Sequence, residues 1–257
     1  MASCDLPLHG RVALVTGAAQ GMGAAHARRL AADGARVAVN DRVPSPELTR
    51  LADELGGIAV PTDVSDRDAV LRMVARINAE LGDVDVLVAN HAHMAMGPLV
   101  SYDLDLWWTT IDTNLGGTFW LIQAVLPGMR RLGEGRVVVV SSEWGVTGWP
   151  EATAYAASKA GLIALVKTLG RELAPEAIIV NAVAPGVTDT PQLQVDAHAA
   201  GVSLEAMCAE YAELIPLGRI GRPDEVSRIV SLLADFRISA MVGQVVQANG
   251  GSTRTRA

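Results

Sequence analysis

The sequence predicts an α/β protein, a single domain built on a doubly wound parallel sheet of about seven strands with helices on both faces. Short β-branched runs recur from one end of the chain to the other. The stretches between them are long enough for crossover helices, a pattern typical of a parallel sheet that is covered on both sides. No linker, repeat or low-complexity segment divides the chain. We therefore expect one domain over residues 1–257.

The expected strands follow one another at seven places: Arg11–Thr16, Arg36–Asn40, Ile58–Pro61, Asp85–Ala89, Arg136–Ser141, Ile178–Val183 and Gln244–Gln247. Between the first two, helical spacing runs from Gly21 to Asp33 and ends at Gly34. A second clear helix covers about 154–173. Residues 188–216 stand outside the alternation, and we interpret them as a lid over a site at the strand ends. A solvated helical insertion is the alternative.

Composition excludes several classes of protein. The formal charge is -7 and the basic residues are scattered, so we expect no nucleic-acid binding. No apolar run approaches the roughly 18 residues of a membrane span. The first residues lack a basic start followed by an apolar stretch, so we expect no secretory signal and a cytoplasmic location. Cys4 and Cys208 show neither metal-ligand spacing nor a disulfide framework, so we expect reduced thiols and no metal site.

The turn after the first strand is rich in glycine. Residues 16–23 read Thr-Gly-Ala-Ala-Gln-Gly-Met-Gly, with a strand before and a helix after. Glycines allow a tight turn, and the free N–H groups of the helix N-terminus then face an anion such as a pyrophosphate. The candidate binding residues are Gly17, Gln20, Gly21, Met22 and Gly23.

A second group of residues carries acid/base chemistry. Tyr155 and Lys159 are four residues apart in a helical segment and share one face. The ammonium favours the phenolate, so it lowers a pKa that starts near about 10 and gives an acid/base group for neutral pH. Ser142 follows a strand and faces the crevice where ligands bind, whereas Ser141 fits a serine that caps its own turn. Asn114 is a poor helix-interior residue, which indicates a specific hydrogen-bonding role.

These motifs, in this order, resemble the classical short-chain dehydrogenase/reductase family from Val12 to Gly251. The resemblance implies a Rossmann-type fold and hydride transfer between a nicotinamide and a carbonyl/alcohol pair. It implies that Tyr155 exchanges the proton and that Ser142 stabilises the substrate oxygen. Lys159 is expected to hold the nicotinamide ribose and Asn114 a proton-relay water.

The nucleotide preference depends on the residues after the second strand. Asp41 can accept hydrogen bonds from ribose hydroxyls and repel a 2′-phosphate, which favours NAD. Arg42 suits a phosphate, which favours NADP. We expect NAD, with NADP as the alternative and a merely solvated turn as a third interpretation.

The resemblance adds further cofactor neighbours. Asp63 and Val64 match an adenine-contacting pair, although Ser65 or Asp66 can also cap the next helix here. The remaining turn residues beside the nicotinamide are Pro185, Gly186, Val187 and Thr188.

The family usually has Asn-Asn-Ala-Gly after the fourth strand, whereas this chain has Ala89-Asn90-His91-Ala92. Asn90 is expected beside the cofactor. Because the side chain at Ala92 is larger than glycine, it narrows the space near that cofactor. His91 and His93 are either substrate-side groups or packed residues.

The expected substrate contacts are His93, Glu143, Trp144 and Trp149, and further candidates are Met94, Met96, Gln192 and Tyr211. Trp and Met favour an apolar, medium-sized substrate such as a cyclic or terpenoid alcohol. Glu143 either recognises a polar or cationic group or points to solvent.

We therefore expect an NAD(H)-dependent oxidoreductase that interconverts a secondary alcohol and a ketone. The alternatives are an NADPH-dependent ketoreductase, including the 3-oxoacyl-carrier type, a non-catalytic nucleotide-binding protein, and a hydratase or epimerase on the same fold. The family resemblance implies a homotetramer, formed through the Tyr155 helix with the preceding long helix and again through Gly243–Gly251.

Overall fold

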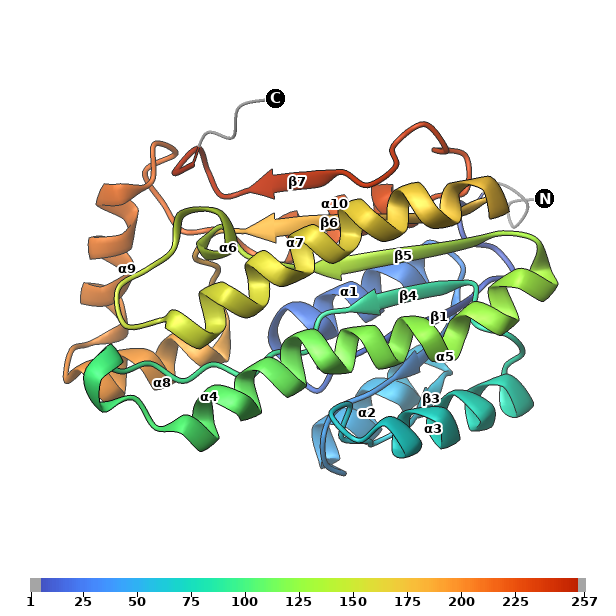
Figure 1. Ribbon diagram of the computed structural model, residues 1–257, viewed down its shortest axis with the longest axis horizontal. Helices are drawn as coiled ribbons and strands as arrows, with labels where there is room; N and C mark the ends of the chain where they lie inside the picture. Colours follow the sequence, from blue (N-terminus) through green and yellow to red (C-terminus); the bar gives the residue numbers. More distant parts are fainter. Residues whose placement is uncertain (1–5, 254–257) are drawn as a thin grey trace.

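A seven-stranded parallel sheet forms the centre of the molecule in the computed structural model, which describes residues 6–253. Its order is β3-β2-β1-β4-β5-β6-β7, and every pairing is parallel (Figure 1). The strands are β1 (Val12–Val15), β2 (Arg36–Val39), β3 (Ile58–Ala59), β4 (Val86–Ala89), β5 (Gly135–Val140), β6 (Ile178–Pro185) and β7 (Val245–Ala248). The predicted fold class and the seven strands are confirmed, with bounds that differ by one or two residues.

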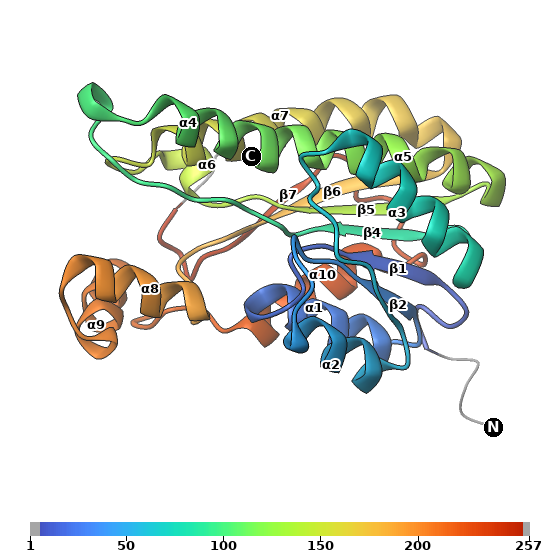
Figure 2. The same ribbon diagram turned by 90° about the horizontal axis from the view of Figure 1, so that it is seen from below.

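Helices cover both faces of this sheet. Figure 2 shows α3, α5 and α7 on one side and α1, α2 and α10 on the other. The helices are α1 (Gly21–Ala32), α2 (Pro46–Leu55), α3 (Arg67–Glu80), α4 (Leu104–Ile111), α5 (Gly117–Leu132), α6 (Trp144–Thr147), α7 (Thr153–Leu173), α8 (Pro191–Ala200), α9 (Leu204–Leu214) and α10 (Pro223–Ala234). Three short turns complete the set: η1 (Leu99–Ser101), η2 (Asp112–Gly116) and η3 (Ala174–Glu176).

The core consists of two apolar layers, one on each face of the sheet. Along β4, Leu87 belongs to the layer under α3, α5 and α7, whereas Val86 and Val88 belong to the layer under α1, α2 and α10. Successive side chains of a strand point to opposite faces. Because both faces are buried, the strands read as continuous apolar runs rather than as an alternation, and this is why they were visible in the sequence.

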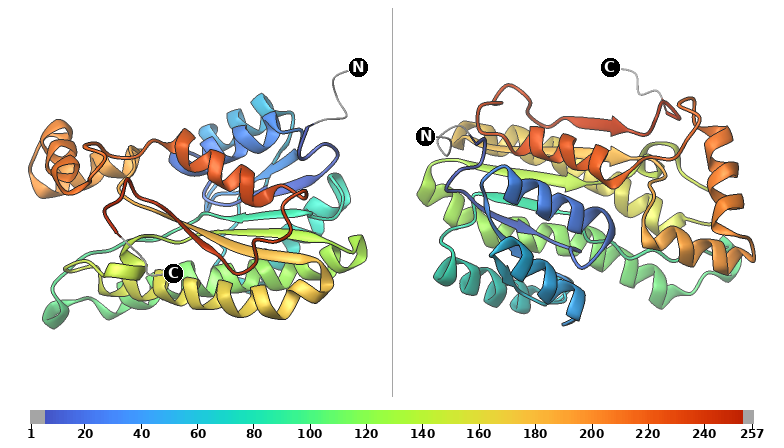
Figure 3. Two further views of the ribbon diagram at one scale, coloured as in Figure 1. Left: turned by 90° about the horizontal axis from the view of Figure 1, so that it is seen from above. Right: turned by 180° about the vertical axis from the view of Figure 1, so that it is seen from behind.

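The position of β1 sets the position of the site. β1 lies between β2 and β4, so the chain extends the sheet in one direction and then in the other. Such a switch point leaves a crevice at the carboxyl ends of the strands. α8 and α9, which form most of the segment expected as a lid, lie beyond that same end of the sheet (Figures 1 and 3).

Two expectations concern absences. Across residues 6–253, no helix combines the length and the apolar character needed to cross a bilayer. Within the same part of the chain, His, Cys, Asp and Glu side chains form no group that could hold a metal ion. Cys208 on α9 is a free thiol, and Cys4 lies outside the described residues.

Candidate functional site

The glycine-rich turn joins β1 to α1 at the switch point. Gly17 and Gly21 adopt the left-handed backbone conformation, with φ of 61° and 57°. A Cβ at Gly23 would lie 2.0 Å from the Gly17 carbonyl oxygen and 2.7 Å from Nδ2 of Asn90. The same Asn90 nitrogen donates to the carbonyl oxygens of Thr16 at 3.0 Å and Gly17 at 3.2 Å. Glycine at position 23 therefore lets the turn close on Asn90.

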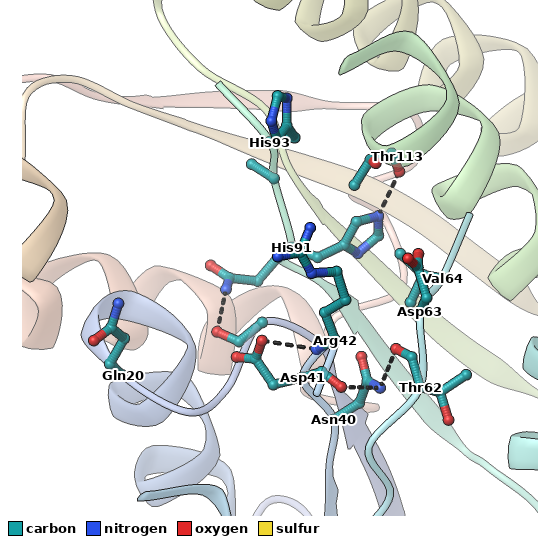
Figure 4. A pocket seen from close by; sticks show the side chains of 13 residues that line it. Gln20, Asn40, Asp41, Arg42, Thr62, Asp63, Val64, His91, His93 and Thr113 are labelled. Carbon is teal, nitrogen blue, oxygen red and sulfur yellow. Dashed lines mark hydrogen bonds between the residues drawn. The ribbon is translucent and has the colours of Figure 1, made fainter. Parts of the chain in front are cut away.

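A cleft of about 340 Å³ runs along the carboxyl ends of β1, β2 and β4 (Figure 4). Seven residues expected at the cofactor line it: Gly17, Gln20, Asp41, Arg42, Asp63, Val64 and Asn90. Six others were not in the expected cofactor set: Asn40, Thr62, His91, Ala92, His93 and Thr113. Met22 lies outside this lining and packs against the apolar core.

Asp41 organises the wall of the cleft. Its Oδ2 accepts a hydrogen bond from the backbone N–H of Ala19 at 3.0 Å, and its Oδ1 accepts one from the N–H of Arg42 at 2.8 Å. The carboxylate thus ties the end of β2 to the glycine-rich turn. Arg42 is exposed, and its side chain extends over the cleft (Figure 4).

Asp63 and Asp66 share the next loop. Asp63 Oδ1 accepts from the backbone N–H and the hydroxyl of Ser65, which leaves the carboxylate at the cleft. Asp66 caps α3 by accepting from the N–H of Ala69 at 3.0 Å. The capping role thus belongs to Asp66, and Ser65 instead donates to Asp63.

The cleft fits a nucleotide with a pyrophosphate. Asn90 Oδ1 is buried and has no hydrogen-bond partner among the described residues. The N-terminus of α1 opens directly after Gln20, where free N–H groups favour an anion. A Cβ at Gly17 would lie 2.9 Å from the Cα of His91. The glycine-rich turn and the loop after β4 therefore approach each other closely at this wall of the cleft. A dinucleotide would be held by this turn, by Asp41 and by the loop at Asp63.

His91 connects the cofactor end of the site to the catalytic end. Its Nδ1 lies 2.8 Å from Thr16 Oγ1, and its Nε2 lies 3.0 Å from the carbonyl oxygen of Thr113. Burial, together with the nearby charge of Lys159, lowers the pKa of His91 to about 4, so the ring is neutral. Because a carbonyl only accepts, Nε2 carries the proton and Nδ1 accepts from Thr16. The sequence signal was a histidine where the family usually has alanine.

Asn114 lies in the π-helical turn η2, between α4 and α5. Its Oδ1 accepts from the N–H of His93 at 2.7 Å, and its Nδ2 donates to the carbonyl of His93 at 2.9 Å and to Ser158 Oγ at 3.0 Å. A π turn widens the helix and recurs at functional sites. Asn114 therefore makes specific hydrogen bonds, as the sequence predicts. They join η2 to the loop after β4 and to α7.

Ser142 and Tyr155 line the same cavity, which is separate from the nucleotide cleft. Ser142 Oγ accepts a hydrogen bond from the N–H of Trp144 at 3.2 Å. Ser141 Oγ instead donates to the carbonyl of Lys159 at 2.9 Å. The expectation that Ser141 caps its own turn is therefore wrong. Neighbouring side chains of extended backbone point to opposite sides, so Ser141 faces α7 and Ser142 faces the cavity.

Lys159 is buried, and its Nζ donates to the carbonyl of Val140 at 2.8 Å. Burial lowers the pKa of Lys159 to about 8. Burial also raises the pKa of Tyr155 above its usual value, and the hydrogen bond with Ser142 opposes that rise. The expected lowering of the Tyr155 pKa is therefore not observed. Nζ lies 5.5 Å from the centroid of the Tyr155 ring and is directed at a backbone carbonyl.

Ser142 and Tyr155 open into a cavity of about 120 Å³, which α8 and α9 line on the far side. A second cavity of about 330 Å³ adjoins it, sharing Glu143, Trp144, Val187 and Tyr211. Of the expected substrate contacts, Met94 and Gln192 line the cavity at Ser142, and Trp149 lines the adjoining cavity.

Two candidates lie elsewhere. His93 lines the nucleotide cleft rather than these cavities, because Asn114 holds its backbone there. Met96 is exposed and lines none of these three spaces.

The turn after β6 completes the catalytic cavity. Pro185 is the buried last residue of β6, and Gly186, Val187 and Thr188 line the cavity. A Cβ at Gly186 would lie 2.8 Å from Cβ of Asn249, so this turn packs closely against the segment after β7.

Comparisons with known proteins agree on one family. A family model described as "Enoyl-(Acyl carrier protein) reductase" matches residues 17–253. The chain is 38% identical to the 3-oxoacyl-[acyl-carrier-protein] reductase FabG of Thermotoga maritima, over 95% of this chain and 98% of the relative.

Two further relatives carry other names. The chain is 39% identical to the cis-4-hydroxycyclohexanecarboxylate dehydrogenase of Sinomonas cyclohexanicum, over 95% of this chain and 96% of that protein. It is 38% identical to the oxidoreductase UcpA of Salmonella typhimurium, over 96% of this chain and 95% of that protein. Similar chains therefore carry the names of both reductases and dehydrogenases.

Proposed function

The chain belongs to the short-chain dehydrogenase/reductase family of oxidoreductases, and from that premise we propose that it interconverts a secondary alcohol and a ketone with NAD(H). One observation carries the proposal. Ser142 and Tyr155 line the wall of one cavity together. The loop after β4 runs from the nucleotide cleft at His93 directly to that cavity at Met94. Proton chemistry and nucleotide binding therefore occur on the two sides of one segment.

The side chains of the site divide the work of the reaction. The Tyr155 hydroxyl gives a proton to the carbonyl oxygen in reduction, or takes it from the alcohol in oxidation. Ser142 donates to the same oxygen and stabilises the charge that develops there. Lys159, when its ammonium turns from the Val140 carbonyl toward Tyr155, favours the phenolate. The bound nicotinamide supplies or accepts the hydride.

Asp41 supports NAD(H) over NADP(H). A carboxylate at the end of β2 accepts hydrogen bonds from ribose hydroxyls and repels a phosphate. Its carboxylate accepts hydrogen bonds from the neutral backbone N–H groups of Ala19 and Arg42, which leaves its negative charge available to select against a phosphate. An NADPH-dependent ketoreductase is the second candidate. The exposed Arg42 on the cleft and the similarity to a 3-oxoacyl-[acyl-carrier-protein] reductase favour it.

The experiment pairs Tyr155→Phe with a matched control, Tyr102→Phe. Tyr102 donates its hydroxyl hydrogen to the Ala95 carbonyl and lines none of the three spaces described above. We expect Tyr155→Phe to lose at least about a hundredfold of kcat, since it removes the general acid, while Tyr102→Phe keeps it. NADH binding, followed by fluorescence titration, should survive in both. Unchanged turnover in Tyr155→Phe, with NADH bound, would refute the proposed chemistry.

Assembly, location and the lid belong to the same proposal. We propose a cytoplasmic homotetramer. Exposed apolar side chains on α4 and α5 support an interface there, among them Leu104, Trp108 and Phe119. Light scattering after gel filtration tests the tetramer, and a monomer would contradict it.

We also propose that α8 and α9 act as a lid, since Gln192 and Tyr211 reach the catalytic cavity from them.

A further inference from the structure

Carboxylates but no basic side chains of residues 6–253 line the cavity at Ser142 and the cavity that adjoins it. Glu143 and Asp196 line the catalytic cavity, and Glu143 also lines the adjoining one. Among the described residues, neither lining contains a lysine, arginine or histidine. The Lys159 ammonium lies behind Tyr155 and is held by the Val140 carbonyl. Substrates that meet Ser142 and Tyr155 therefore come close to carboxylates and to no basic side chain of these linings.

Glu143 is the central residue of this surface. Its exposed fraction is only 7%, yet no arginine, lysine or histidine within residues 6–253 pairs with it. Its Oε2 accepts from the hydroxyls of Ser252 and Thr253. Its Oε1 accepts no hydrogen bond from the described part of the chain. An ionised carboxylate is costly to bury without a charge partner, so a ligand cation would complete the arrangement.

Three aromatic side chains line the adjoining cavity, and two of them, Trp144 and Tyr211, also line the catalytic one. Trp144 and Trp149 stack with their centroids 5.0 Å apart and their planes 7° apart. Tyr211 approaches Trp149 at 6.3 Å from the lid side. Ring faces attract a cation within about 6 Å of the centroid, and quaternary ammonium groups are recognised in this way.

We propose that the substrate is a ketone or secondary alcohol that also carries an ammonium group, bound by Glu143 and the aromatic rings of Trp144, Trp149 and Tyr211. This inference rests on the proposed function of the same site. Glu143 and Ser142 line the same cavity, so one small substrate can present its reacting carbon to Ser142 and its ammonium to Glu143. A carboxylate at that place would be repelled by Glu143 and Asp196. The substrate of this chain would then be positively charged, whereas the cis-4-hydroxycyclohexanecarboxylate dehydrogenase to which the chain is similar is named for a carboxylate.

The test compares three cyclohexanones that differ only in the group opposite the carbonyl: trimethylammonio, tert-butyl or carboxylate. The first two have the same shape and differ in charge. We expect kcat/KM to be at least about tenfold higher for the trimethylammonio ketone than for the tert-butyl ketone, and lowest for the carboxylate. Glu143→Gln should reduce the trimethylammonio/tert-butyl ratio by about tenfold. Glu213→Gln is the control. It removes an exposed charge from α9, the helix that carries Tyr211, and should leave that ratio unchanged.

A binding measurement separates this inference from the proposed reaction. Quenching of tryptophan fluorescence gives the Kd of each ketone for the NADH-saturated protein without turnover. Tighter binding of the trimethylammonio ketone supports the inference even if no ketone is reduced, an outcome that would count against the proposed reaction alone. Turnover with equal or better use of the tert-butyl or carboxylate ketone would overturn the inference and leave the reaction standing. Equal affinities for the charged and neutral ketones would also overturn it.

Discussion

His91 Nδ1 accepts a hydrogen bond from Thr16 Oγ1 at 2.8 Å, and through this contact the loop after β4 is joined to the last residue before the glycine-rich turn. The opposite edge of the ring donates to the Thr113 carbonyl in η2, next to Asn114. A single neutral imidazole thus spans the cofactor turn and the turn that carries Asn114. This relationship predicts effects on binding and stability together.

Substitution of His91 tests that bridge. His91→Ala removes the ring that pairs with the Thr16 hydroxyl and the Thr113 carbonyl and opens a cavity. We expect the free energy of unfolding to fall by about 2–4 kcal/mol and the Kd for NADH to rise. Chemical denaturation and fluorescence titration measure the two effects. His9→Ala, at an exposed site, serves as control and should change stability by less than about 0.5 kcal/mol. Equal stability of both variants would contradict the bridge.

Nucleotide choice should follow charge at the end of β2. Asp41→Ser removes the carboxylate but keeps a hydroxyl for the turn, so we expect the preference for NADH over NADPH to fall by about tenfold or more. Arg42→Ala removes the cation at the cleft and should shift the preference toward NADH. The ratio of the two Kd values from fluorescence titration reports both. An unchanged ratio in Asp41→Ser would show that this carboxylate does not select the nucleotide.

Close packing predicts a strict requirement for glycine at position 23. In Gly23→Ala the new methyl would meet the Gly17 carbonyl oxygen at 2.0 Å, so the turn must open. We expect NADH binding to weaken by about tenfold or more, with destabilisation of about 1–3 kcal/mol. Gly97→Ala is the control, because its Cβ would meet Tyr102 at an ordinary 3.5 Å. Wild-type NADH affinity in Gly23→Ala would contradict the close approach.

Stability should fall as the pH drops below neutrality. Burial lowers the pKa of His26 to about 4, from 6.5 in the unfolded chain. Between pH 6.5 and pH 4, His26 is protonated in the unfolded state but stays neutral in the folded state. The free energy of unfolding therefore decreases as the pH falls from 6.5 toward 4. Between pH 7.5 and pH 5 this costs about 2 kcal/mol for His26. His91, with a pKa also near 4, acts in the same direction.

Denaturation of wild type and His26→Gln at these two pH values measures the contribution. The difference in unfolding free energy between pH 7.5 and pH 5 should be about 2 kcal/mol smaller in the variant. The window stays above the acidic range in which Glu225 titrates, since its hydrogen bond with Arg219 lowers its pKa to about 2. An identical pH dependence in both proteins would show that His26 does not titrate in this way.

Much of the architecture could be predicted because its physical causes are local. β-Branched runs form strands wherever they stand, and burial on both faces makes such runs conspicuous. Tyr155 and Lys159 lie on one face of α7 because helical geometry fixes residues four apart. Gly17, Gly21 and Gly23 mark the turn because only glycine tolerates its backbone and its contacts. For these features the sequence by itself determined the outcome.

Tertiary structure alone decided the direction and partner of several side chains. His91 bonds Thr16 and Thr113, and His93 joins the nucleotide cleft, because the loop after β4 meets η2 in space. Lys159 bonds the Val140 carbonyl, so burial rather than its charge dominates the pKa of Tyr155. Such contacts depend on how distant segments pack and on which groups lose water. Local propensity carries no information on either, so the sequence predicted which residues gather at the site but not how they pair there.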